Sequence, residues 1–437
     1  MKKAIFLFLF LPSLLCSQEK RALTLSEAVH LGLSNNKAIQ ISAMKTVAAD
    51  ARSGELNASR LPSMKLQAGY TRLSEIDPFA VKLPISPVPI QISPSVLNNY
   101  SSKLMVAQPV FTGFRIEKSA QAAELAAEAS RYDHTKNRSD LVYDIKNAYW
   151  NLCKAREVKR VIDENVEQMQ AHVKDIENML ARGLATTNDV LKVQVQLSST
   201  ELSRIDAENA AQTAMMTLNL LIGLPVETEL EVASAVDSAA REYGSGPDLL
   251  EKVSASRADL KAAERRIQSA EASATAAKGA WYPQVYLTGS YYYARPNPRI
   301  MPTKDEFKDT WDAGVSLSFD VWNWGTTKYQ AEQAEAASLQ SRYAYEQLKD
   351  AVVLEVKQSL LSLEQAKEKV AVAEKGVGQA EENHRIVKNR FKNGTATSTD
   401  LLDAETALLQ AKLNLTIARV DNQLAQARMM KALGMES

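Results

Sequence analysis

The chain has little of the chemistry that enzymes and metal sites use. Only two cysteines occur among 437 residues, Cys16 and Cys153, which excludes a disulfide framework and a cysteine-based zinc site. The sequence offers no nucleophile with a base partner and no glycine-rich phosphate loop. It therefore predicts neither an enzyme nor a bound metal or other cofactor. Four histidines without metal-ligand spacing, which we expect on the surface or in helix seams, are His30, His134, His172 and His384.

An excess charge of one sign is also lacking. Lysine and arginine together number 52, as do aspartate and glutamate, so the formal net charge is zero. No basic patch with interleaved aromatics is present, so we expect no nucleic-acid partner. After the first residues, no apolar run reaches the roughly 18 residues that a spanning helix needs. We therefore predict a mature protein without a transmembrane helix.

The first residues predict an export signal. Lys2 and Lys3 precede an apolar run from Ala4 to Leu15, which is too short to span a bilayer as a helix. Cleavage near Ser17 is the plain interpretation and gives a signal peptide over 1–17. Lipid attachment at Cys16 is an alternative, although a bulky leucine stands where lipoprotein signals usually carry a small residue.

One stretch occurs twice. Residues 178–197 and 389–408 share their glycine, alanine–threonine, aspartate and leucine at matching offsets. In each copy a heptad-like pattern stops at the glycine and restarts at the threonine, which predicts a helix end followed by a helix start. Each copy therefore predicts the tip of a helical hairpin, near 183–189 and near 393–400. The offset between the halves is 211 residues from Phe111/Trp322 to Gly223/Gly434.

The two halves repeat one order of elements. In each half a helix ends at a proline, at Pro62 and at Pro283, and period-two alternation then predicts two strands. Each half then has a helix of about 68 residues, roughly 100 Å long, with an apolar seam of coiled-coil spacing. The predicted strands are about 63–74, 101–111, 284–294 and 311–321. The predicted divisions are a first repeat 18–224, an equatorial linker 225–247 and a second repeat 248–437.

Aromatic residues stand at the ends of these strands. Trp281, Trp322 and Trp324 fall at helix-side ends and Trp311 at a loop-side end, which favours the two girdles of membrane strands. A half-buried soluble sheet with an aromatic rim is the alternative. Four strands cannot close a barrel, since the smallest bacterial barrels use about eight, and open edges are not tolerated in lipid. The sequence therefore predicts several chains sharing one barrel that continues into a helical tube.

The chain resembles TolC-type outer membrane efflux proteins over nearly all of its mature length. The motifs are Leu23–Ala28 (LTLSEA) with Asn35-Asn36, Arg60-Leu61-Pro62, Gln108–Gly113 (QPVFTG), Arg257–Leu260 (RADL) and both tips. The resemblance implies a mainly α fold with a membrane β-barrel, built from two structural repeats of a long helical hairpin plus two strands. It implies a homotrimer, with a twelve-stranded barrel in the Gram-negative outer membrane continued by a periplasmic α-helical barrel.

The resemblance also implies a function and a set of site residues. The function is the passive exit duct of a tripartite efflux or type I secretion system, docked to a periplasmic adaptor (membrane fusion) protein and an inner-membrane pump. The residues matching the adaptor contact are Arg182, Gly183, Leu184, Asn393, Gly394 and Thr395. The residues matching the periplasmic gate are Asp189, Phe391, Asp400 and Asp403. The family's gate also uses an aromatic hydroxyl and a basic residue, whereas Phe391 and Ala396 stand here, so Lys392 or Arg390 could substitute.

Simpler interpretations stay open. Thr186 with Asp189, and Thr397 with Asp400, resemble capping boxes, which would explain both acids without a gate. Asp403 lies beyond the cap, and three chains would place about six carboxylates in a ring that favours cations. For the whole protein, an exported coiled-coil structural protein explains the helices but not the strands. Within the duct interpretation, drug, metal and protein substrates all remain open.

Overall fold

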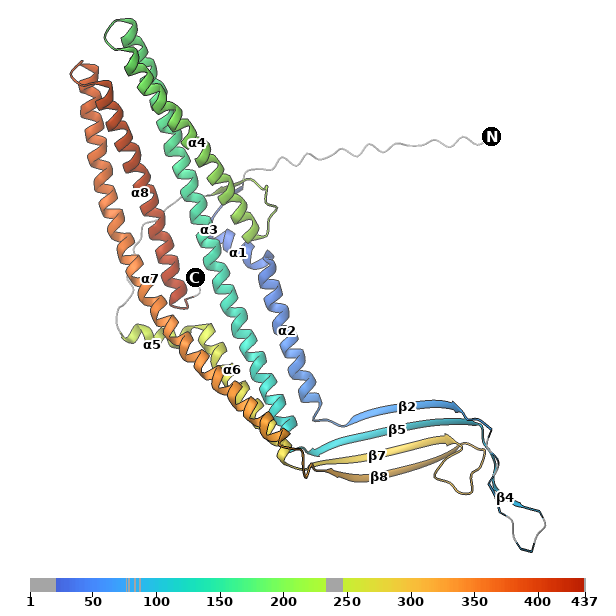
Figure 1. Cartoon of the computed structure of the whole chain (residues 1–437). Helices are drawn as coiled ribbons and strands as arrows, with labels where there is room; N and C mark the ends of the chain where they lie inside the picture. Colours follow the sequence, from blue (N-terminus) through green and yellow to red (C-terminus); the bar gives the residue numbers. More distant parts are fainter. Residues whose placement is uncertain are drawn as a thin grey trace, which may run out of the picture. The chain divides into compact units, whose positions relative to one another are not determined.

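The computed structural model describes residues 21–75, 77, 79–81, 84–85, 88–232 and 247–435. The predicted signal peptide, Cys16 and most of the predicted linker lie outside these residues. The elements in chain order (Figure 1) are β1 Arg21–Leu23, α1 Leu25–Asn35, α2 Lys37–Ala58, β2 Ser63–Arg72, β3 Phe79–Val81, β4 Ile90–Ser93, β5 Asn98–Phe111, α3 Arg115–Ala181, α4 Thr187–Ile222, β6 Leu230–Val232, α5 Pro247–Ser256, α6 Ala258–Lys278, η1 Gly279–Trp281, β7 Gln284–Arg295, β8 Lys308–Ser318, α7 Thr326–Lys392 and α8 Ser398–Ala432.

Two compact units cut across the two predicted repeats. The hairpin unit comprises Met1–Ile41, Lys136–Arg257 and Ala351–Ser437, and the strand unit comprises Ser42–Thr135 and Ala258–Asp350. Each repeat therefore contributes to both units. The sequence repeat follows the order of the chain, whereas compactness follows which segments pack together.

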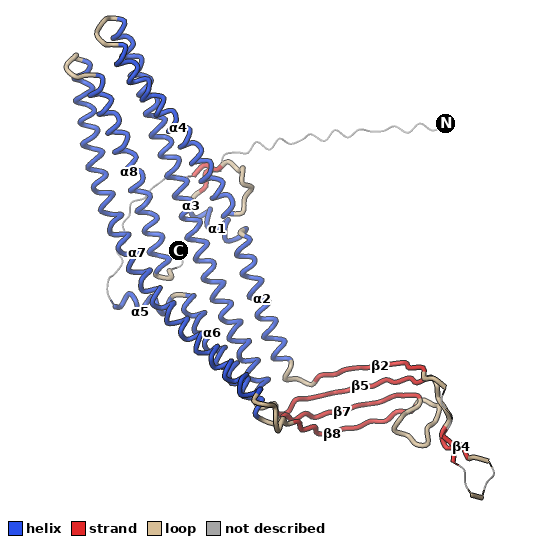
Figure 2. Tube along the Cα trace, viewed as in Figure 1, coloured by secondary structure: helices blue, strands red, loops and turns tan. Residues whose placement is uncertain are grey.

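The strand unit contains a four-stranded antiparallel sheet in the order β2-β5-β7-β8 (Figure 2). It also contains a two-stranded antiparallel sheet of β3 and β4. The register of the four-stranded sheet confirms the predicted alternation. One row across the strands is apolar, Leu66, Leu104, Tyr291 and Trp311, and the adjacent row is Gln67, Lys103, Tyr292 and Thr310. Because successive side chains point to opposite faces, the sheet has one apolar and one polar face. β8 begins three residues before the predicted strand because Lys308 still pairs with Ala294.

Two contacts explain the motifs QPVFTG and Arg60-Leu61-Pro62. Gly113 has φ +64°, and a Cβ there would lie 2.2 Å from the carbonyl oxygen of Gly279, so only glycine fits where β5 ends. The Gln108 amide donates to the carbonyl of Arg60 at 2.9 Å. These contacts hold the start of β2 and the end of β5 at one side of the sheet.

Two predicted helices are each divided in the structure. The helix that was expected to run up to Pro62 breaks at Asn36, which is extended and whose side-chain amide donates to the Leu221 carbonyl at 2.9 Å. The helix that was expected to run up to Pro283 breaks at Arg257, whose guanidinium donates to Glu355 at 2.7 Å and to the Ala432 carbonyl at 3.1 Å. Both predictions of a continuous helix were wrong, because the bonds that stabilise each break come from distant segments.

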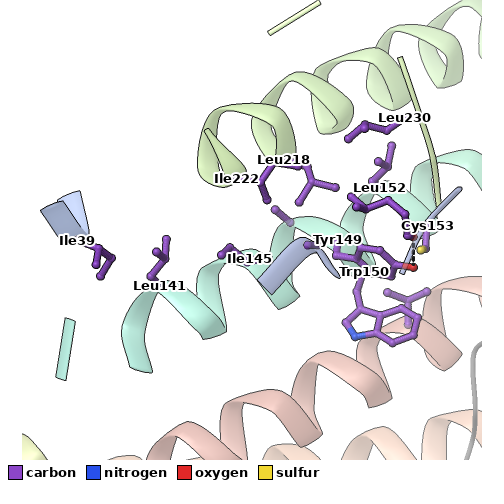
Figure 3. Close-up of a cluster of buried hydrophobic side chains, with 14 residues drawn as sticks. Ile39, Leu141, Ile145, Tyr149, Trp150, Leu152, Cys153, Leu218, Ile222 and Leu230 are labelled. Carbon is purple, nitrogen blue, oxygen red and sulfur yellow. Dashed lines mark hydrogen bonds between the residues drawn. The ribbon is translucent and has the colours of Figure 1, made fainter. Parts of the chain in front are cut away.

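The core of the hairpin unit lies where β1 and β6 pair in parallel beside α1, α3 and α4 (Figure 3). Tyr149 is 1 % exposed, and its hydroxyl donates to the Leu23 carbonyl at 3.1 Å. Leu152, Leu218 and Ile222 are fully buried around it. Each such aliphatic side chain contributes about 1.5–3 kcal/mol on burial. This core anchors the base of the α3–α4 hairpin.

Candidate functional site

Both hairpin tips are built on the same turn. Gly183 and Gly394 have φ of +71° and +70°, a left-handed conformation that L side chains rarely adopt. The amide of Leu184 donates to the Met179 carbonyl at 2.9 Å, and that of Thr395 donates to the Arg390 carbonyl at 2.8 Å. These bonds satisfy carbonyls that a helix end leaves free. The predicted helix stops are therefore confirmed at both tips.

The predicted capping boxes are present. Thr186 and Thr397 precede α4 and α8, and their hydroxyls accept from the backbone amides of Asp189 and Asp400 at 3.2 and 3.1 Å. Each carboxylate accepts in return from the amide and the hydroxyl of its threonine. The Thr186 hydroxyl chiefly lowers the pKa of Asp189, and the Thr397 amide chiefly lowers that of Asp400. Both acids thus start a helix, whatever further role they have.

The residues matched to the adaptor contact are all exposed. These are Arg182, Gly183, Leu184, Asn393, Gly394 and Thr395. Leu184 is 69 % exposed, an apolar side chain at the first tip. Asp403 is exposed one turn after Asp400 on α8. Arg390, considered above as a substitute for the missing basic gate residue, donates to the Thr395 carbonyl of its own tip at 3.1 Å.

Phe391 joins the two hairpins without a hydrogen bond. It is 8 % exposed and packs with Ile176 and Val190 of the first hairpin and Leu401 of the second. Its ring meets the His172 ring edge-on, with centroids 5.7 Å apart. Phe391 is thus an apolar contact between the two hairpins.

A buried polar cluster beside Phe391 was missed by the sequence interpretation. His172 Nδ1 lies 2.9 Å from Glu405 Oε2, and these side chains are 2 % and 3 % exposed. The sequence carried a signal for it, because Glu405 falls within the buried stripe of Leu401, Ala404 and Leu408 on α8. A lone acid in an apolar stripe predicts a buried partner, since an unpaired buried charge is costly.

The predicted girdle residues are exposed in the strand unit. Trp281, Trp311, Trp322 and Trp324 are 50, 73, 74 and 85 % exposed. Trp311 lies inside β8 on the apolar face, opposite Tyr291, rather than at the strand end that was predicted. Trp322 and Trp324 follow β8 and contact each other edge-on at 5.7 Å. Large exposed aromatics on an apolar face are typical of a surface that contacts lipid.

Over residues 21–232, apart from short gaps, and 247–435, no three His, Cys, Asp or Glu side chains gather closely enough to hold a metal ion. Within that described part of the chain, no helix is both long and apolar enough to cross a membrane.

Long helical hairpins and a two-faced antiparallel sheet in one chain are typical of outer-membrane channels. The chain belongs to the outer membrane efflux protein family, whose model matches residues 28–224 and 249–435. It is a mainly helical outer membrane efflux channel of the Gram-negative, TolC-like type, as the resemblance predicted.

Individual relatives are similar at low identity. The toxin and drug export protein A of Aggregatibacter actinomycetemcomitans is 23% identical over 72% of this chain and 70% of its own length. The outer membrane protein OprJ of Pseudomonas aeruginosa is 22% identical over 94% of this chain and 84% of its own. The structure of the Campylobacter jejuni CmeC outer membrane channel superimposes with a TM-score of 0.81 at 17% identity, covering 94% of this chain and 85% of that one.

Proposed function

We propose that the protein is the passive exit duct of a tripartite efflux or type I secretion system, assembled as a homotrimer. The observation that carries this proposal is the sheet. In the described residues β2 pairs only with β5 and β8 only with β7, so both outer strands have an unused edge. Lipid tolerates a sheet only when its edges are closed. Three copies would supply a twelve-stranded barrel, with the apolar face toward lipid and the polar face toward the lumen.

The hairpin tips are the proposed contact with the periplasmic adaptor, which would connect the duct to an inner-membrane pump. The exposed residues at the tips form two similar surfaces for such a partner. Asp189, Asp400, Asp403 and Phe391 are the proposed residues of the periplasmic gate. No catalysis is assigned to the protein, and the relatives support a non-enzymatic role by family inference.

The pump, rather than this channel, selects the substrate in the proposed system. Similar proteins are named for exporting toxin and drugs and for exporting pyoverdine. We therefore propose export of small molecules or proteins without a substrate-binding site in this chain.

Single-channel recording of the detergent-solubilised protein in a planar bilayer, with its mass measured in parallel, tests this proposal. We expect a stable trimer with small, cation-selective currents, because an acidic and nearly closed entrance would limit conduction. Large unselective currents would retain the duct but remove the proposed gate. A water-soluble protein without currents would contradict the proposal and favour an exported coiled-coil structural protein.

A further inference from the structure

Five polar side chains form a continuous network between the two hairpins, which we call the seam network. Its members are Gln168 and His172 on α3, His384 on α7, and Ser398 and Glu405 on α8. The Glu405 carboxylate accepts from His172 at 2.9 Å and from the Gln168 amide at 2.9 Å. Ser398 Oγ lies 3.3 Å from His172 Nε2. The network therefore connects three helices across a buried interface.

The bonds of this network require one protonation state of His384. The Gln168 amide nitrogen carries two hydrogens, and one of them goes to Glu405 Oε1. The other points to His384 Nε2 at 3.0 Å, so that ring nitrogen must be the acceptor and the ring must be neutral. Protonating His384 would set one N–H against another. A buried polar network with one mismatched donor destabilises the packing around it.

Burial and two nearby lysines also favour the neutral form of His384, whereas one nearby carboxylate opposes them. Burial lowers the pKa of His384, and the nearby Lys388 and Lys412 lower it further, while Glu405, with Oε1 3.9 Å from Nε2, opposes them. A histidine with a lowered folded pKa stabilises the packed state fully above its ordinary value of about 6.5. That contribution is lost as the pH falls below this value toward the folded pKa. Acid therefore weakens the interface.

The other repeat lacks both histidines and the acid of the network, although Gln379 and Thr187 stand at the positions that match Gln168 and Ser398. At the offset of 211 residues, His172 corresponds to Asn383 and Glu405 corresponds to Gln194. Asn383 is exposed, and Gln194 donates to Glu177 of its own hairpin at 3.3 Å. The turns and caps recur in both repeats, so the hairpin architecture does not require the seam network. A feature present in one repeat alone points to a role specific to the interface between these two hairpins.

We propose that the seam network is a proton-sensitive connection that holds the two hairpins of one chain together at neutral pH and releases them in acid. The proposal rests on the duct function above, because release of the hairpins is what would widen the periplasmic entrance. His172 and Glu405 act as positioning residues in this connection, and His384 is its titrating group. In the trimer, only the interface within each chain carries it.

The test is single-channel conductance of the full-length protein between about pH 7.5 and about pH 5.5, the range in which histidine titrates. We expect conductance of the native protein to rise on acidification. His384→Gln should lose most of that rise, because glutamine keeps an acceptor oxygen but does not titrate. Glu405→Gln should raise the open population at neutral pH by about tenfold, because its amide adds a donor facing two existing donors.

Control measurements distinguish an effect of the seam network from misfolding of the variant and from failure of the duct function. His30→Gln replaces an exposed histidine of the same unit and should retain the native pH response. Each variant's trimer mass is measured in parallel. A native pH response in His384→Gln, or native neutral conductance in a trimeric Glu405→Gln, would overturn the proposal. A native protein that forms no conducting trimer would instead count against the duct function.

Discussion

The two hairpin tips share a turn and a cap but differ in the residues packed behind them. Gly183 and Gly394 have nearly the same backbone angle, and Asp189 and Asp400 make the same capping bonds. Behind the second tip stands the buried Phe391, whereas the first repeat has a half-buried leucine, Leu180, at that position. Residues common to both tips serve the turn, because each helical hairpin needs one. Residues that differ are the better candidates for a function at one interface.

The substitution with the largest expected effect changes the glycine that both tips share. Replacing Gly183 or Gly394 with glutamate should abolish most export by the intact system in cells while leaving outer-membrane levels near normal. Apart from the neighbouring residues of the chain, no atom lies within 4 Å of the Cβ that the change adds, so the change places a charge on the exposed tip, at the cost of backbone strain of roughly 1–2 kcal/mol. Export assays and immunoblots of outer membranes measure both quantities. Normal export would place the adaptor contact elsewhere.

A second substitution tests the position behind the tip at which the two repeats differ. Phe391→Ala should lower the free energy of unfolding by about 3 kcal/mol, because it leaves a cavity between the hairpins. Leu180→Ala, its counterpart in the first repeat, should cost clearly less because Leu180 is only partly buried. Denaturant unfolding of both variants gives the comparison. Equal losses would mean that the two positions pack equivalently in the assembled protein.

The second tip carries a pair of acids that we place in the lumen, and the first tip lacks this pair. Asp403 has Lys192 as its counterpart in the first repeat, so the second tip alone carries two acids on one face of its helix. Asp400→Ala with Asp403→Ala should weaken block by multivalent cations severalfold and leave the trimer intact. Asp189→Ala is the matched control with a smaller effect. Unchanged block in the double variant would remove these acids from the lumen.

The smallest expected effect is the loss of a helix cap, which should cost the same stability at both tips. Thr186→Ala and Thr397→Ala each remove a capping hydroxyl and should cost about 1 kcal/mol of stability. The lowered pKa values of Asp189 and Asp400 add a pH dependence: their contribution is present above about pH 4 and is lost as the pH falls through the folded values. Thermal unfolding of both variants against pH measures this, and a clear inequality between tips would show that one cap also serves the gate.

Much of the fold was predictable because its signals are local. The start of α4 at Thr187 is set by a capping threonine, as predicted, and its end at Ile222 is set by a left-handed glycine. The faces of the sheet follow from alternation within each strand. The divided helices were not predicted, since Asn36 and Arg257 break them through bonds to α4, α7 and α8.

The candidate site also has a part that the sequence predicted and a part that only the structure showed. The sequence by itself determined both tips and their caps, because each depends on residues within one turn of one another. It also determined the duplication, because that is a match between residues 211 positions apart. Only the tertiary structure decided that Phe391 is an apolar contact and that His172, His384 and Glu405 meet. Those residues are separated by up to 233 positions along the chain. Periodicity places a residue on a helix face, but its partner is chosen by the packing of one hairpin against another.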